Sequence, residues 1–189
     1  KEGDLLLGNS ATYFTAIGAL MWLSNRTRPD IAFAVNVLAR YTSKPTERHW
    51  SGVKRIFRYL KGTSDHGLLY QMNDTWDIRG YADAGFKSDP LTAKSQGGYA
   101  FIAGSAAVSW KSKKQTRIAT STAHAELLAL YEGGREAAWL WRLRTFIEKS
   151  TGLIGGDVPP IAIHEHNEAC IAQVQKDFIR NDATKHIDP

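Results

Sequence analysis

The apolar residues of this chain change their spacing near Gly67, and that change limits the folds it can adopt. Up to about Lys61 they recur at helical intervals, as in Phe14, Ile17 and Leu20. After Gly67, short apolar runs alternate with glycine and polar turns, which is the pattern of β-strands. A long helical pattern then covers residues 122–149. The sequence therefore predicts an α/β fold in which a helical segment precedes a sheet that carries one long helix.

The expected elements follow from this spacing and from the breakers between them. Helices are predicted over 11–26, 30–42 and 46–61, then over 122–149, 168–175 and 183–188. Strands are predicted over 67–71, 77–83, 97–103, 106–112 and 161–166. Gly133 and Gly134 inside the long helix predict a kink or a close approach to a neighbour. The chain is expected to comprise a helical segment, 1–65, and an α/β domain, 66–189.

Composition excludes several classes of protein. With 43% hydrophobic and 23% charged residues, the 189-residue chain is typical of a globular protein. It has no apolar run of about 18 residues, which argues against a membrane span. The net charge of +5 favours polyanionic partners. The single cysteine, Cys170, cannot form an internal disulfide.

The first residues, Lys1-Glu2-Gly3-Asp4, include neither an initiator methionine nor the charged and apolar sections of a signal peptide. This start predicts a fragment of a longer polyprotein. An intracellular location, in the cytoplasm or the nucleus, is the corresponding expectation.

Acidic residues stand at the ends of the expected elements. Asp83 ends a strand, Glu126 lies early in the long helix, and Asp188 is the penultimate residue. Carboxylates gathered from strand ends and helices build oxygen-rich sites for hard divalent cations. Each residue also has an ordinary interpretation, because aspartate is common in turns and helical glutamates are usually solvated. The pattern alone leaves both interpretations open.

Several longer segments carry a more specific signal. They are Thr27-Arg28-Pro29-Asp30-Ile31-Ala32, Arg48-His49-Trp50, Arg58-Tyr59-Leu60-Lys61-Gly62-Thr63, Ser109-Trp110-Lys111-Ser112-Lys113-Lys114-Gln115 and Thr184-Lys185-His186-Ile187-Asp188. With the acidic residues, they resemble the ribonuclease H domain of copia-type LTR retrotransposon Pol polyproteins, preceded by the segment that connects it to the reverse transcriptase.

The resemblance implies a ribonuclease H-like fold with a five-stranded mixed sheet flanked by helices. It implies cleavage of the RNA strand of an RNA–DNA hybrid with two Mg²⁺ ions, Mn²⁺ being the alternative cofactor. The implied catalytic positions are Asp83, Glu126, His166 and Asp188, and the implied metal ligands among them are Asp83, Glu126 and Asp188. The implied partners are the hybrid or another nucleic acid and the rest of a reverse transcriptase.

His166 departs from the family pattern. The family's strand motif ends in Glu-Asp-Asn and its aspartate binds metal, whereas this chain has Glu165-His166-Asn167. Neutral imidazole is a poor ligand for Mg²⁺. Glu165 is not expected to replace the aspartate, because neighbouring strand residues point to opposite faces. His164 is expected to share the face of His166, and the pair could hold a softer metal such as zinc.

Three origins of His166 stay open: a degenerate copy, a host-adapted inactive domain, or a deliberate knockout. The alternative function is therefore a catalytically inactive module, derived from a retrotransposon reverse transcriptase, that binds nucleic acid or has a structural role.

A basic segment follows Trp110 and is the predicted nucleic-acid contact. Its backbone-binding candidates are Lys111, Lys113, Lys114, Gln115 and Arg117. Ser121 and Thr122 are expected to cap the long helix and, with the free N–H groups of its first turn, to hold a phosphate. The alternative interpretation of the basic segment is a solvated hairpin.

Overall fold

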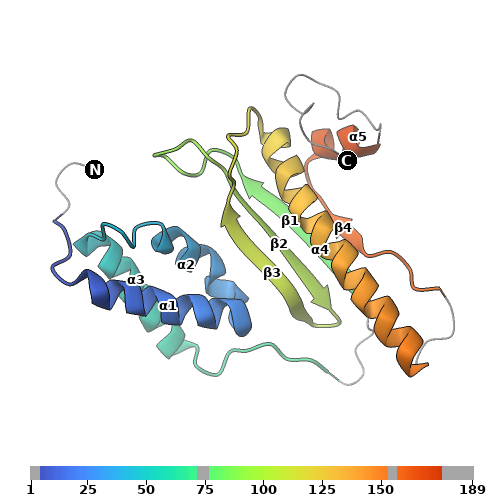
Figure 1. The fold of residues 1–189 in the computed structure, drawn as a ribbon, viewed down its shortest axis with the longest axis horizontal. Helices are drawn as coiled ribbons and strands as arrows, with labels where there is room; N and C mark the ends of the chain where they lie inside the picture. Colours follow the sequence, from blue (N-terminus) through green and yellow to red (C-terminus); the bar gives the residue numbers. More distant parts are fainter. Residues whose placement is uncertain (1–4, 72–76, 153–156, 176–189) are drawn as a thin grey trace. The chain divides into compact units, whose positions relative to one another are not determined.

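The computed structural model describes residues 5–71, 77–152 and 157–175. By the contacts within the chain, it divides into two compact units, Lys1–Leu69 and Tyr70–Pro189. The described part of the first unit is helical, and that of the second is α/β (Figure 1). None of the helices in these described ranges is long and apolar enough to cross a membrane.

The helical unit contains α1 (Ser10–Arg26), the short 3₁₀ helix η1 (Pro29–Ile31), α2 (Ala32–Ala39) and α3 (Glu47–Gly62). Its first and last helices begin at polar caps. The Asn9 side chain accepts a hydrogen bond from the backbone N–H of Thr12, and Thr46 forms a capping box with His49. The three predicted helices are confirmed, and Pro29 opens the turn that leads into the second of them.

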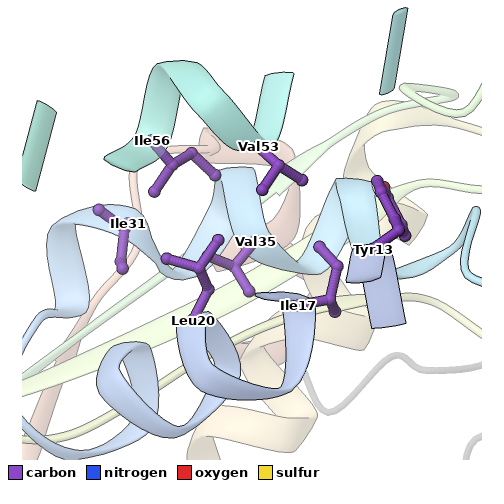
Figure 2. Packing of buried hydrophobic residues seen from close by; sticks show 7 residues of the cluster. All are labelled: Tyr13, Ile17, Leu20, Ile31, Val35, Val53 and Ile56. Atoms are coloured by element: carbon purple, nitrogen blue, oxygen red, sulfur yellow. The ribbon is translucent and has the colours of Figure 1, made fainter. Parts of the chain in front are cut away.

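Large apolar side chains fill the centre of the helical unit (Figure 2). The buried cluster comprises Tyr13, Ile17, Leu20, Ile31, Val35, Val53 and Ile56. The Tyr13 hydroxyl donates a 2.8 Å hydrogen bond to the Leu38 carbonyl, so burial of this aromatic ring leaves no unpaired hydroxyl. Burial of each large side chain contributes roughly 1.5–3 kcal/mol.

Two of the sequence segments that carry the family resemblance meet inside this unit. The buried Arg28 guanidinium donates to the Asp30 carboxylate at 2.8 Å and to the Thr63 carbonyl at 2.9 Å. The Tyr59 hydroxyl donates to the same carboxylate at 2.8 Å. Hydrogen bonding by Arg28 lowers the pKa of Asp30. These segments therefore form a structural network that joins the start of α2 to the end of α3.

The α/β unit is built on a mixed sheet of β1 (Ile78–Gly85), β2 (Gln96–Ala103), β3 (Ala106–Lys114) and β4 (Ala162–His164), in the order β3-β2-β1-β4. The first three strands are antiparallel to their neighbours, and β4 is parallel to β1. Gly80 lies where a Cβ atom would come 2.4 Å from the Phe101 ring, so only glycine fits without a shift.

The sheet has four strands in the described ranges, and the fifth strand predicted over 67–71 is not formed. These residues are mostly exposed, with Leu69 70% exposed. The Tyr70 hydroxyl reaches the Ala107 carbonyl at 2.6 Å, but no backbone ladder of the described residues includes the segment. Apolar spacing alone does not make a strand, because a strand also needs a partner for its backbone.

The long helix α4 (Thr122–Thr151) confirms the prediction over 122–149 and packs on β1 and β2 (Figure 1). It begins at Ser121, whose hydroxyl accepts from the His124 N–H at 3.1 Å, and it ends at Gly152 with φ +66°. A Cβ on Gly133 would come into ordinary contact with Ala82 and Tyr99, which agrees with a close approach there. Small side chains bring the helix close to the sheet; those of one buried cluster are Ala84, Ala119, Ala125 and Ala129.

Helix α5 (Glu168–Gln175) follows β4 and confirms the prediction over 168–175. The Asn167 side chain caps it by accepting from the Cys170 N–H at 2.9 Å. The strand before it, predicted over 161–166, is shorter than expected because β4 ends at His164. The terminal helix predicted over 183–188 lies outside the described residues.

Candidate metal centre

The site lies where β1, β4 and α4 come together. Because β4 is parallel to β1, with His164 opposite Tyr81, the carboxyl ends of both strands lie at one edge of the sheet. Helix α4 begins near that edge, after its cap at Ser121 (Figure 1). The topology thus places a strand end, a second strand end and a helix start within reach of one another.

Three side chains converge at this edge. One ligand atom from each of Asp83, Glu126 and His166 lies within 4.8 Å of the other two. Asp83 and His166 are exposed, whereas Glu126 is only 4% exposed. These are three of the four positions that the family resemblance implied. The fourth, Asp188, lies outside the described residues.

The environment of Glu126 favours its protonated form. Burial, followed by the negative charges of Glu165 and Asp83, raises its pKa to about 7. The His166 ring and a hydrogen bond from the backbone of Ala84 act in the opposite direction and are weaker. The Oε2 atom of Glu126 is buried and has no hydrogen-bond partner among the described residues. Such an oxygen is costly unless a proton or a cation joins it.

Glu165 is the residue that the sequence analysis placed wrongly. Strand β4 ends at His164, so the alternation of strand faces does not extend to residue 165. The Glu165 side chain is 4% exposed, and its charge acts on Glu126 more strongly than that of Asp83. Its Oε1 accepts from the backbone N–H groups of His166 at 2.8 Å and Asn167 at 2.9 Å. The signal available in the sequence was the turn that Asn167 introduces before α5.

His166 and His164 have different surroundings. The Nδ1 atom of His166 lies 3.6 Å from Glu165 Oε1, and the His166 side chain is 72% exposed. The His164 ring stacks on Tyr81, with centroids 5.0 Å apart, and it is not a member of the converging group. The predicted pairing of these two histidines around a metal is therefore not what the described residues show.

Cys170 is fully buried near the same charges. Burial, then Glu165 and Glu126, raises its pKa to about 11. A thiol with so high a pKa is a poor nucleophile at neutral pH. It packs as a small apolar side chain.

The basic segment is divided between structural and exposed side chains. Lys114 forms a 2.9 Å ion pair with the buried Asp89, and this hydrogen bond holds the pKa of Asp89 far below its usual range. Gln115 donates to the Ala125 carbonyl at 2.8 Å and thereby ties the end of β3 to α4. Lys114 and Gln115 are thus already engaged in the fold.

The other cations of the segment surround a hollow of about 360 Å³ beside α4, which Lys111, Lys113 and Arg117 help to line. Lys111 lies 3.6 Å from the half-exposed Glu132. Burial, followed by the charge of Arg117, lowers the pKa of His124 in the first turn of α4. This face of the α/β unit is cationic.

The predicted phosphate-binding residues lie at the start of α4. Ser121 caps the helix as expected, and Thr122 is its first residue. No contact of either residue with a phosphate follows from the cap alone, so that role stays a prediction.

Comparison with known proteins gives the class of the chain. It is 37% identical over 183 residues to the retrovirus-related Pol polyprotein from transposon TNT 1-94 of Nicotiana tabacum, and the match covers 96% of this chain and 13% of the polyprotein. It is 36% identical over 139 residues to the Pol polyprotein from transposon RE2 of Arabidopsis thaliana, or 74% of this chain and 10% of that protein. The chain therefore spans only about an eighth or less of these polyproteins.

A shorter relative is covered almost completely. The chain is 42% identical over 128 residues to secreted RxLR effector protein 161 of Plasmopara viticola, and the match covers 68% of this chain and 90% of that protein. No family model and no solved structure matches the chain. The chain belongs to the family that includes this protein and the matching segments of the retrotransposon Pol polyproteins, and its origin is a retrotransposon Pol sequence.

Proposed function

We propose that the α/β unit is a ribonuclease H-type domain that hydrolyses the RNA strand of RNA–DNA hybrids with divalent metal ions. The observation that carries the proposal is the convergence of Asp83, Glu126 and His166 at the edge of a mixed sheet. The Pol relatives support it, since reverse transcription produces such hybrids. The proposed domains are the helical segment 1–65 and the α/β domain 66–189.

The donor set fits a divalent ion in part. Asp83 offers exposed carboxylate oxygens, and Glu126 offers a buried oxygen without a partner among the described residues. His166 offers nitrogen where Mg²⁺ favours oxygen. The chemistry that divalent ions supply when bound is activation of water and stabilisation of charge on the phosphate. The carboxylates of Asp83 and Glu126 would hold the ions, and Asp188 is the proposed further ligand.

The rest of the chain's contribution is positioning. The free N–H groups of the first turn of α4, with Ser121 and Thr122, orient a phosphate of the cleaved strand. Lys111, Lys113 and Arg117 contact the backbone of the duplex without reading its sequence. The other two predicted contacts, Lys114 and Gln115, act by holding the shape of this surface.

The test is cleavage of a labelled RNA–DNA hybrid with Mg²⁺ or Mn²⁺, with the chain beside its His166→Asp and Asp83→Asn variants. We expect little cleavage with Mg²⁺, partial rescue by Mn²⁺, and a gain from His166→Asp on the order of a hundredfold. Asp83→Asn should abolish the remaining activity. If His166→Asp cleaves no hybrid with either ion, the proposed nuclease function is wrong.

A second candidate is a catalytically inactive module that binds nucleic acid. His166 favours it, because a neutral ring replaces a charged ligand while the cationic face beside α4 is kept. This candidate predicts hybrid binding without cleavage by the chain as it stands. A structural role with the rest of a reverse transcriptase is compatible with both candidates, since the TNT 1-94 match is a small part of a longer polypeptide.

A further inference from the structure

The ligand set of the candidate metal centre does not suit Mg²⁺. Two carboxylates and one imidazole, from Asp83, Glu126 and His166, lie within 4.8 Å of one another. Mg²⁺ demands near-octahedral oxygen geometry, whereas imidazole suits zinc and its neighbours in the first transition row. A histidine at residue 166 therefore changes which metal the site selects.

Glu165 gives His166 the surroundings of a metal-binding histidine. Such histidines almost always direct their second ring nitrogen at a carboxylate or a carbonyl, which fixes the ring. Here His166 Nδ1 faces Glu165 Oε1 at 3.6 Å. The carboxylate is itself fixed, because it accepts two backbone N–H groups and its side chain is 4% exposed. This arrangement leaves Nε2 as the ligand atom.

Glu126 provides an independent sign of a ligand. Its side chain is more than nine-tenths buried, and its Oε2 has no hydrogen-bond partner among the described residues. Ligand atoms around a tetrahedral zinc ion lie about 3.3 Å apart, given bonds of about 2.0–2.2 Å. A separation of 4.8 Å closes to that value by a small rotation of the exposed His166 side chain.

We propose that Asp83, Glu126 and His166 bind one transition-metal ion of the zinc class, with Glu165 as the residue that positions the His166 ring. Three protein ligands leave a fourth position open, as in catalytic zinc sites. The inference deepens the proposed function and rests on it for the location of the metal centre.

The test is titration calorimetry of the full chain with Zn²⁺, Mn²⁺ and Mg²⁺ separately, without nucleic acid. We expect one Zn²⁺ per chain, bound more tightly than Mn²⁺, and Mg²⁺ weakest. His166→Ala should weaken Zn²⁺ binding by about tenfold or more, and Glu165→Gln by about tenfold. The matched control is His164→Ala, which removes a histidine two residues away and should leave the affinity unchanged.

Two further measurements separate a structural explanation. Circular dichroism should show the same fold for each variant, and the His166 ring nitrogen signals should shift when Zn²⁺ is added to the chain labelled with ¹⁵N. Equal affinity for Mg²⁺ and Zn²⁺, or Zn²⁺ binding that survives His166→Ala, would overturn the inference. Zn²⁺ binding without hybrid cleavage would leave it standing while the nuclease proposal fails.

Discussion

The helical unit and the α/β unit are stabilised by different kinds of side chain. The helical unit buries large apolar residues such as Tyr13, Ile17 and Leu20. The α/β unit packs α4 on its sheet largely through alanines, and its buried polar residues are Asp89, Ser95, Gln96, His124, Glu126 and Glu148. Buried charge costs stability unless it is paired, so the unit that carries the site has the less favourable interior.

The largest effect that tests this contrast is expected from Lys114→Ala. The variant leaves the Asp89 carboxylate buried without its ion pair, and breaking a buried pair costs about 3–5 kcal/mol. Chemical denaturation followed by circular dichroism measures the loss. Lys113→Ala, at a neighbouring cation, is the control and should change stability little. Equal effects of the two variants would contradict a structural role for Lys114.

The next effect concerns the helical unit. Ile17→Ala should lower its stability by about 2–5 kcal/mol, because Ile17 is 2% exposed within the apolar cluster. Phe14→Ala on the same helix is the control, since Phe14 is 67% exposed. Denaturation measures both variants, and their Zn²⁺ affinity should stay unchanged by calorimetry. A loss of affinity in Ile17→Ala would show that the two units are not independent.

Glu126→Gln should have the opposite sign and stabilise the metal-free chain. The folded pKa of about 7 is above the ordinary 4.5, so the carboxyl's contribution to stability is present below about pH 4.5 and is lost as pH rises through about 7. The variant should remove this loss, on the order of 2 kcal/mol at pH 8. Denaturation in a chelator at pH 5 and pH 8 measures it, with Glu132→Gln, at a half-exposed position of α4, as the control. A pH dependence equal in wild type and variant would assign it to another group.

The smallest effect is expected at the cations of the hollow. Replacing Lys111 and Lys113 by alanine should flatten the salt dependence of hybrid affinity by about 1 logarithmic unit per lost phosphate contact. The control pair, Lys54→Ala with Arg55→Ala, removes the same charge from α3. An unchanged slope in the first pair would exclude this segment as the contact surface.

Local signals predicted most of the elements, and long-range pairing was beyond them. Pro29 and Gly62 marked helix limits correctly, but residues 67–71 had strand spacing without a backbone partner. The partner of Lys114 is Asp89, 25 positions away, and no local pattern reveals such a pair.

The candidate site divides in the same way. The meeting of Asp83, Glu126 and His166 was expected from the family resemblance, whereas spacing alone left other interpretations open. Glu165 was misplaced because the end of β4 at His164 depends on the turn into α5.

Strand β4 pairs with β1 over only three residues, from Ala162 to His164. So short a ladder gives weak local protection, and its amides should exchange with solvent through local opening. A ligand that joins the end of β4 to β1 and α4 would oppose that opening by mass action. Hydrogen exchange of β4 and α5 would then report on occupancy, and a bound metal would fasten this edge of the sheet.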